Sequence, residues 1–459
     1  AWRGADINNI LNFSKSFPNS TIIKLEQNYR STKTILDAAF HVVSKNKNRA
    51  DKKLWTDNEK GDPIYINEFE NENKEARGVI DNVLESVDKN HTLNDMVLLY
   101  RTNSQSRVIE DRLRRESVPY HIVGGVKFYD RKEIKDILAY LRYLINPKDS
   151  ISFLRIVNFP TRGIGKSVTE KIIKQLNTTG SDLEDILKKL DNLGLSVKQI
   201  EKVDAFNQII RKLKKTRDKT ALETVEQLIE KIKIKDYYTN KDNPDDYERL
   251  ENIQEFISSV SDFSDRNENN GIGPFIEEVS LLTDIDRWNA NEQKLTLMTL
   301  HSSKGLEFKS VYILGAEEGL LPLTHNNDDD DLEEERRLFY VGVTRGIKKV
   351  SISYANSRRR FGVSSMFSLR SSFIDAIPPE LCSLNSSSNY SKQLTSKIAK
   401  PFKTEDEFKI NDMVNHKLYG NGKIIKIQGI GENSKISIKF RGNMIKKFIK
   451  KYANLKIIN

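Results

Sequence analysis

The stretch Leu295-Thr296-Leu297-Met298-Thr299-Leu300-His301-Ser302-Ser303-Lys304-Gly305-Leu306-Glu307-Phe308 decides how this chain is interpreted. Its first six residues are apolar or β-branched and predict a buried strand. The polar loop that follows carries Lys304 and Glu307 around Gly305, which lets a backbone approach a ligand closely. The pattern predicts a strand that runs into a ligand-binding loop. A plain strand and turn, with Glu307 as a helix-capping residue, is the alternative.

Working outward, strands and helices alternate on both sides of a long helical interruption. Between about 131 and about 287 the apolar residues recur at helical spacing. Predicted strands occur both before and after this helical stretch, which favours one α/β lobe with an inserted helical domain. If the two groups of strands belonged to separate domains, each sheet would be too small to bury a core. The predicted strands are 21–25, 64–69, 96–100, 120–123, 295–300, 311–314 and 350–354, with helices at 32–44, after a Ser31/Thr32 cap, and at 72–87.

The end of the chain combines a Ser- and Asn-rich segment with a series of short predicted strands. Residues 384–397 (LNSSSNYSKQLTSK) are rich in Ser and Asn and predict a flexible linker. Short predicted strands follow at 413–416, 422–428, 435–440 and 444–448, the spacing of a small SH3-like β-barrel. The net charge is +10, and +8 of it lies in the last 59 residues. This basic end predicts a polyanion or an acidic protein as partner, with a solubilising lysine-rich end as the alternative.

Composition excludes several classes of protein. No apolar run reaches the roughly 20 residues of a membrane span. No leader-like segment opens the chain, so secretion has no support. Cys382 is the single cysteine, which excludes an internal disulfide framework, and six scattered histidines without HxxxH spacing disfavour a zinc site. We predict no metal site, and expect Asp328–Asp331 to form a hydrated loop. Because the chain opens on Ala1 inside a motif-like stretch, we expect a fragment.

Two other segments carry candidate chemistry. Leu25–Thr32 (LEQNYRST) lies between a predicted strand and a helix, which we expect at the carboxyl end of a parallel sheet. Tyr29 there is suited to stack on a base and Arg30 to reach a phosphate, although a surface Tyr–Arg pair is the alternative. In Glu333–Arg345 (EEERRLFYVGVTR), Arg345 is expected at a helix end capped by Gly346. An arginine there suits stabilisation of a transferring phosphate, or simply compensates the helix dipole.

In order and spacing, these segments resemble motifs IV, V and VI of the superfamily 1A DNA helicases, the UvrD/PcrA/Rep family. Trp2–Asp6 resembles the end of motif III, and residues 123–142 resemble another block of the family. The resemblance covers about the whole chain and is nearest the PcrA/UvrD branch, because a basic barrel follows the linker. It implies an α/β fold, with a RecA-like parallel-sheet lobe at 1–129 and 288–382, an inserted all-helical domain at 130–287, a linker at 383–403, and a small SH3/Tudor-like β-barrel at 404–459.

The resemblance also implies roles for the residues that match its motifs. The residues implied to bind ATP are Tyr29 at the adenine, Arg30 and Arg345 at the γ-phosphate, Glu307 at the ribose, and Lys304 and Gly305 near the phosphates or the lobe interface. Those implied to bind DNA are Trp2, Arg3, Thr299, His301 and the stacking residue Phe361, with Gly163, Gly165 and Lys166 on duplex phosphates. The last three resemble a P-loop, but Pro160 stands where its first glycine is needed, and a plain interhelical turn is the alternative.

The function implied by the resemblance is that of the C-terminal portion of an ATP-dependent 3′-to-5′ DNA helicase of DNA repair. It would be cytoplasmic in a bacterial-type cell, with an organellar destination left open. ATP with Mg²⁺ is the implied cofactor. No GxxxxGK[ST] or Walker B block occurs, so the Mg²⁺ ligands are expected outside this chain, and the chain alone is expected to be inactive.

The implied partners are single-stranded and duplex DNA, and RNA polymerase or repair proteins through the barrel. A non-catalytic module that binds DNA or RNA polymerase is the first alternative to the interpretation as a helicase. A helicase–nuclease subunit of RecB type is the second, and it is disfavoured because no nuclease-like carboxylate cluster follows the motor segments.

Overall fold

The structure, a computed structural model, describes residues 17, 19–21, 23, 25–47, 53–88, 91–179, 183–215, 219–239, 243–288, 293–323, 329–360, 363–385, 408–416, 419–428, 434–440, 445–450, 453 and 455–458. The chain divides into two compact units. The first comprises residues 1–125, 288–358 and 364–459, and the second comprises residues 126–287 and 359–363. The helical segment of the second unit starts at residue 126, and the domain bounds 130–287 expected from the sequence stay a prediction.

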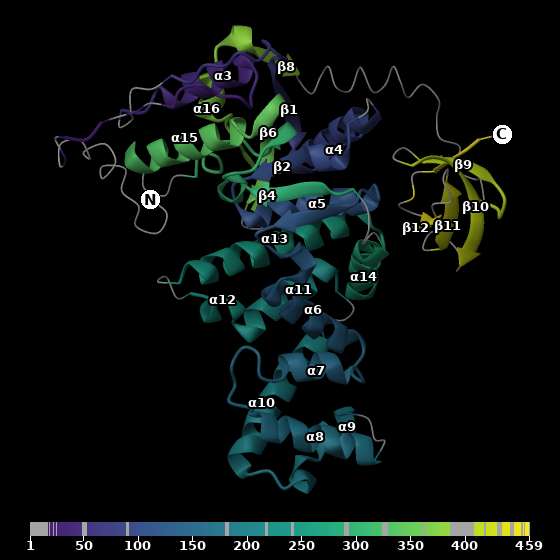
Figure 1. The fold of residues 1–459 in the computed structure, drawn as a ribbon. Helices are drawn as coiled ribbons and strands as arrows, with labels where there is room; N and C mark the ends of the chain where they lie inside the picture. Colours follow the sequence, from purple (N-terminus) through teal and green to yellow (C-terminus); the bar gives the residue numbers. More distant parts are fainter. Residues whose placement is uncertain are drawn as a thin grey trace. The chain divides into compact units, whose positions relative to one another are not determined.

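A parallel sheet in the order β3-β4-β2-β5-β6-β1-β8 forms the centre of the first unit, and β7 pairs with β6 (Figure 1). Every neighbouring pair along this order is parallel. All five residues of β2 are buried, as expected of a strand covered on both faces. The strands are β1 (Ile64–Asn71), β2 (Met96–Tyr100), β3 (Tyr120–Val123), β4 (Leu295–Thr299), β5 (Phe308–Ile313), β6 (Gly346–Arg360), β7 (Val363–Phe367) and β8 (Cys382–Asn385).

Helices cover both faces of this sheet. Val97 and Leu99 of β2 pack in one core with α3 (Lys33–Val43) and α15 (Asp329–Val343). The alternate residues Leu98 and Tyr100 pack on the other face with α4 (Glu72–Asp88) and α5 (Ser106–Arg115). Short α16 (Ser372–Asp375) joins the first core through Phe373. The doubly covered parallel sheet confirms the predicted α/β class.

The long segment of the second unit, residues 126–287, contains helices and no strand over its described residues, and it has its own core. Tyr143, Phe153 and Phe206 form an aromatic cluster in it, with ring centroids 5.9–6.5 Å apart. The inserted helical domain is therefore confirmed. Its helices are α6 (Lys132–Ile145), α7 (Ser150–Ile156), α8 (Lys166–Thr179), α9 (Leu183–Lys188), α10 (Val197–Lys214), α11 (Ala221–Ile232), α12 (Ile234–Tyr237), α13 (Pro244–Arg266) and α14 (Ile272–Trp288).

The C-terminal segment forms a separate antiparallel sheet in the order β12-β11-β10-β9-β13. Alternate residues such as Val414, Ile424 and Ile438 make its small core. A Cβ on Gly422 would lie 2.6 Å from side-chain atoms of Ile438 and Phe440, so glycine is required for this close approach. The small β-domain agrees with the prediction. Its strands are β9 (Met413–His416), β10 (Gly420–Gln428), β11 (Lys435–Phe440), β12 (Ile445–Ile449) and β13 (Leu455–Ile457).

The strand predicted at 21–25 is wrong at its described positions. Thr21, Ile23 and Leu25 belong to no strand, and the last two are 80% and 79% exposed. Alternating apolar residues do not make a strand unless a neighbour supplies hydrogen bonds. Among the described residues of this stretch, such a neighbour is found at Gln27, which forms an isolated parallel bridge with Trp55.

The predicted helix at 32–44 is present as α3, but neither Ser31 nor Thr32 caps it with a side chain. Ser31 Oγ instead donates to the Gly346 carbonyl at 2.7 Å. The first amides of the helix donate to the carbonyls of Glu59 and Lys60, at 3.1 and 3.0 Å. A backbone segment distant in sequence therefore replaces the predicted cap.

Three other local predictions differ from the structure. Gly346 starts β6 and is not a left-handed helix cap. Residues 329–331 begin α15 and do not form a loop, while Asp328 lies outside the described residues. Residues 383–385, expected to start the linker, belong to β8 and pair with β1; the remaining linker positions lie outside the described residues. Every described helix is too short or too polar to cross a membrane.

Candidate functional site

Three residues implied to bind ATP meet in space although they are far apart in sequence. Arg30 Nε donates to Glu307 Oε2 at 2.6 Å. Arg345 lies in the same cluster, because its Nη1 donates to the carbonyl of Leu306 at 3.1 Å and Arg30 Nη1 donates to the carbonyl of Thr344 at 3.5 Å. The cluster therefore combines two guanidinium groups with one carboxylate.

Strand order explains this meeting. Glu307 directly precedes β5 and Arg345 directly precedes β6, and these neighbouring parallel strands start level with each other, with Phe308 opposite Gly346. The Phe308 amide donates to the Arg345 carbonyl at 3.0 Å. Arg30 joins them because the next two residues are bonded to the start of β6, Ser31 at Gly346 and Thr32 at Ile347.

The cluster lies at the amino edge of the sheet, which corrects one prediction. We expected Leu25–Thr32 at the carboxyl edge, on the assumption that a strand precedes it. No described residue of 21–25 is in a strand, and the segment instead packs against the first residues of β6. The edge at which a segment lies depends on such tertiary contacts, and the sequence pattern does not report them.

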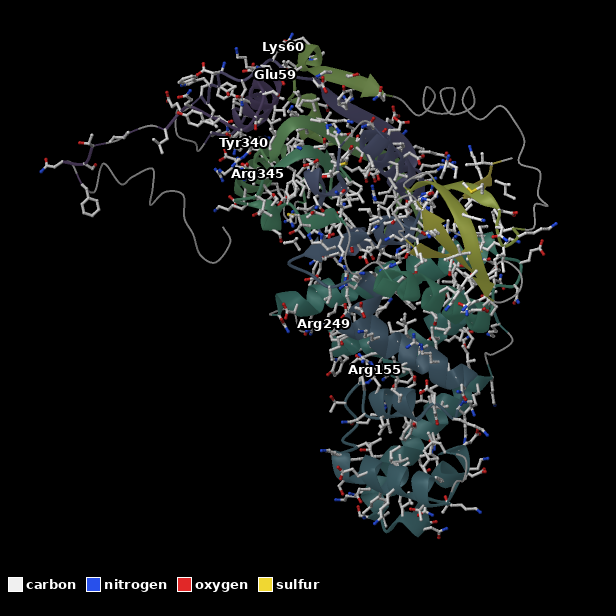
Figure 2. All side chains as sticks on the ribbon, turned by 45° about the vertical axis from the view of Figure 1, so that its right-hand side comes forward. Glu59, Lys60, Arg155, Arg249, Tyr340 and Arg345 are labelled. Atoms are coloured by element: carbon white, nitrogen blue, oxygen red, sulfur yellow. The ribbon has the colours of Figure 1, made fainter. Side chains whose placement is uncertain are left out.

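Arg345 is held in place by the backbone around it. Its Nε donates to the Val341 carbonyl in α15 at 2.9 Å, and Nη2 lies 3.3 Å from Thr344 Oγ1. Figure 2 shows Arg345 beside Tyr340, near the end of this helix. Burial, followed by the charge of Arg30, lowers the pKa of Arg345. Two nearby guanidiniums favour an anion between them; the Glu307 carboxylate meets part of this need, and a phosphate would meet it better.

The surroundings of the cluster fit a nucleotide. Tyr29 is 79% exposed and presents a flat ring next to Arg30. Gly305 has a φ of +90°, and a Cβ built on it meets no atom within 4 Å, so the loop leaves open space beside its backbone. Lys304, its neighbour, is exposed. An aromatic face, two guanidiniums and an open glycine suit a base, a triphosphate and a close backbone approach.

Thr299 and His301 lie apart from this cluster, at the opposite edge of the sheet. Thr299 ends β4, where it pairs with Tyr100 at the end of β2, and its Oγ1 is 3.0 Å from Ser302 Oγ. Partial burial of the ring, followed by the charge of Arg101, lowers the pKa of His301, which therefore stays neutral at pH 7. Residues 300–307 thus connect the carboxyl edge of β4 to the amino edge of β5.

The loop with Gly163, Gly165 and Lys166 belongs to the helical unit and connects α7 to α8. Gly163 has a φ of +71°, and its carbonyl accepts a bond from Lys202 Nζ at 3.2 Å. Asn158 Oδ1 accepts from the amides of residues 162 and 164 at 2.9 and 3.0 Å, which fixes the turn. Lys166, 90% exposed at its side chain, opens α8. An ordered loop that ends at a helix N-terminus with an exposed lysine is suited to a phosphate.

Some site residues are outside the described part of the chain, and others were missed by the sequence analysis. Trp2, Arg3 and Phe361 lie outside the described residues. Asp57 was missed, although Gln27 Nε2 donates to its Oδ2 at 2.9 Å. Gln27 stands inside a segment that we had singled out, but Asp57 has no local signal in the sequence. Within the described ranges, no group of three or more His, Cys, Asp or Glu is arranged to hold a metal ion.

The described residues combine a parallel α/β lobe, paired arginines at one edge of its sheet, a helical insertion and a small β-domain. Residues 23–357 match the family of UvrD-like helicase C-terminal domains, and residues 410–456 match the PcrA/UvrD tudor domain. The chain therefore belongs to the UvrD-like helicase C-terminal domain family, which confirms the resemblance seen in the sequence.

Curated relatives are similar along almost the whole chain. The ATP-dependent DNA helicase PcrA of Bacillus subtilis is 39% identical over 464 residues, covering 96% of this chain and 62% of the relative. The PcrA helicases of Staphylococcus aureus (strain Mu50) and Staphylococcus epidermidis are each 37% identical, covering 98% of this chain and 64% of theirs. The chain thus spans a little under two thirds of the length of these relatives.

Proposed function

We propose that this chain is the C-terminal portion of an ATP-dependent DNA helicase that couples ATP hydrolysis to movement on single-stranded DNA. The observation that carries the proposal is the meeting of Arg30, Glu307 and Arg345 at one edge of the sheet. Residues separated by 277 positions are brought within hydrogen-bonding distance there, next to an exposed aromatic ring. The names of the similar proteins, ATP-dependent DNA helicases, agree with this proposal.

In this proposal the chain supplies one wall of the nucleotide site. Tyr29 stacks on the adenine, Glu307 accepts from the ribose hydroxyls, and Arg30 with Arg345 binds the γ-phosphate. Lys304 and Gly305 line the path of the phosphates. ATP supplies the phosphoryl transfer whose free energy drives the motor, and the two arginines stabilise the charge that develops on the transferring group. The Mg²⁺ ligands and the phosphate cradle are proposed to lie on the rest of the protein, so the chain alone hydrolyses no ATP.

The DNA contacts are proposed for both units. Thr299 and His301 would contact single-stranded DNA, with Trp2, Arg3 and Phe361 stacking or binding beside them. The loop with Gly163, Gly165 and Lys166 would hold duplex phosphates.

We also propose 3′-to-5′ polarity, a role in DNA repair, a bacterial cytoplasmic location, and RNA polymerase or repair proteins as partners of the C-terminal β-domain. Residues 1–129, 130–287, 288–382, 383–403 and 404–459 remain our proposed domains, except that residues 383–385 belong to the sheet of the α/β lobe and not to the linker.

A non-catalytic DNA- or polymerase-binding module is the second proposal, favoured by the basic C-terminal end. Lys423 and Lys439 are cross-strand partners on β10 and β11, and both are exposed. Binding of phosphates weakens steeply as salt rises, with a slope proportional to the contacts made, whereas a mainly apolar protein contact does not. The salt slope of DNA binding therefore separates the two kinds of partner.

The test of the helicase proposal is Arg345→Ala in the full-length protein. We expect DNA-stimulated kcat to fall by about 10³-fold or more, the usual loss when an arginine that stabilises phosphoryl transfer is removed. Single-stranded DNA affinity without nucleotide should stay within about twofold. Arg337→Ala is the matched control, since Arg337 pairs with Glu333 and Glu334 on α15. An Arg345→Ala variant with unchanged kcat would refute the proposal.

A further inference from the structure

The loop that presents Tyr29 and Arg30 is attached to a second segment, residues 55–60, on both of its sides. Before the loop, the Trp55 amide donates to the Glu26 carbonyl at 3.0 Å and the Trp55 carbonyl accepts from Asn28 at 2.8 Å. After it, the carbonyls of Glu59 and Lys60, labelled in Figure 2, accept from the first amides of α3. The backbone of the loop is therefore fixed at both ends.

A chain of side-chain hydrogen bonds runs from the same segment to the tyrosine ring. Asp57 Oδ2 accepts from Gln27 Nε2 at 2.9 Å, and Gln27 Oε1 accepts from the Tyr29 hydroxyl at 2.7 Å. The Asp57 charge strengthens the first bond, and it orients the amide so that its oxygen faces the phenol. Because Tyr29 is 79% exposed, packing restrains its ring little, and the bond to Gln27 restrains the outer end of the ring.

We propose that Asp57 is a positioning residue for nucleotide binding: through Gln27 it holds the Tyr29 ring in the orientation that receives the base. The inference rests on the proposed function, in which Tyr29 stacks on adenine. It concerns binding and not phosphoryl transfer, because Asp57 bonds to Gln27 and is not among the described hydrogen-bond partners of Arg30 and Arg345. Pre-orienting an exposed ring reduces the entropy lost on binding.

The expected effect is a change in affinity without a change in turnover. In the full-length protein, Asp57→Ala should raise the KM for ATP about three- to tenfold. Without the bond to Gln27, the Tyr29 ring samples several rotamers, and nucleotide binding must then restrict it to one. The dissociation constant of a non-hydrolysable ATP analogue should rise by the same factor, while kcat stays within about twofold. Asp57→Asn, which keeps an acceptor oxygen, should recover most of the affinity.

A double-mutant cycle separates positioning from a structural role. Tyr29→Phe keeps the ring and removes the hydroxyl, so Asp57→Ala should have no further effect in that background. If Asp57→Ala raises KM equally in both backgrounds, Asp57 acts through the fold of residues 55–60 and the inference is overturned. Asp62→Ala is the control for loss of a nearby exposed carboxylate, and it should leave KM unchanged.

The outcomes also distinguish this inference from the proposed function. If Tyr29→Ala leaves analogue affinity unchanged, the proposed base stack is wrong. If Tyr29→Ala weakens the affinity tenfold or more but Asp57→Ala does not weaken it, only the role of Asp57 is wrong. Gln27→Leu should reproduce Asp57→Ala, since it removes both bonds of the chain.

Discussion

Arg358, near the end of β6, is ion-paired with two buried carboxylates, and its removal should destabilise the α/β sheet strongly. Its Nε and Nη2 donate to the two oxygens of Glu317 at 3.0 and 2.7 Å, and Nη2 also bonds Glu75. The side chains of Arg358, Glu75 and Glu317 are 12%, 3% and 0% exposed. Although burial by itself disfavours the charge, the two carboxylates raise the pKa of Arg358 above its usual range.

The magnitude follows from what Arg358→Met leaves behind. Glu75 and Glu317 also accept backbone amides, from Gly315 at 2.9 Å and from Ala355 at 2.8 Å, so they cannot simply turn outward. Removing one member of a buried ion pair costs about 3–5 kcal/mol, because the remaining charge is buried without compensation. A loss of about 4 kcal/mol corresponds to a roughly thousandfold increase in local opening.

Hydrogen exchange, read by mass spectrometry on peptides from β1 and β6, measures this opening directly. The neighbouring Arg359 is a matched control, because it pairs with Asp262 and Asp265 of the helical unit and its side chain is 28% exposed. Arg359→Met should cost about 1 kcal/mol or less. In a triple variant, Glu75→Gln and Glu317→Gln added to Arg358→Met should restore part of the protection.

The reasoning is refuted if Arg358→Met slows or leaves unchanged the exchange of β6, or if its effect matches that of Arg359→Met. Either result would mean that the carboxylates become protonated or hydrated at little cost. The triple variant provides a second test, because in that case its hydrogen-exchange protection should equal that of Arg358→Met.

Three other predictions concern the remaining parts of the chain. Burial lowers the pKa of His416 to about 4, below about 6.5 in an unfolded chain, so the C-terminal sheet should keep full stability above pH 6.5 and lose about 3 kcal/mol as pH falls to 4. Equal protection of β10 and β11 at pH 7 and pH 4.5, after correction for intrinsic exchange, contradicts this. Glu307→Gln should remove most of the roughly tenfold preference for ATP over 2′,3′-dideoxy-ATP that a charged hydrogen bond to ribose provides; an unchanged ratio of KM values argues against a ribose contact. Lys166→Ala should lower the salt slope of duplex binding by about 0.9, and an unaltered slope means that Lys166 contacts no phosphate.

Much of the fold was predictable because buried parallel strands have a simple signature. Met96–Tyr100 is a continuous apolar run, which a strand covered on both faces must have. Tyr120–Val123 lies at the edge of the sheet, and His121 within it is exposed. The helical insertion was visible because its apolar residues change from strand to helical spacing. The strand predicted at 21–25 was wrong because its alternating pattern is local, whereas a strand forms only where a neighbouring strand supplies hydrogen bonds.

The sequence by itself determined the order of the elements, the family and the residue types suited to a nucleotide, since these depend on local spacing and on motif content. Only the tertiary structure decided that Arg30, Glu307 and Arg345 meet at the amino edge of the sheet, and that Asp57 reaches Tyr29 through Gln27. The contact between Arg30 and Glu307 bridges 277 positions, and it exists because β5 and β6 are neighbours and residues 31 and 32 bond to the start of β6. Strand order is set by how the whole sheet buries its two faces, a property that no single stretch of the chain carries.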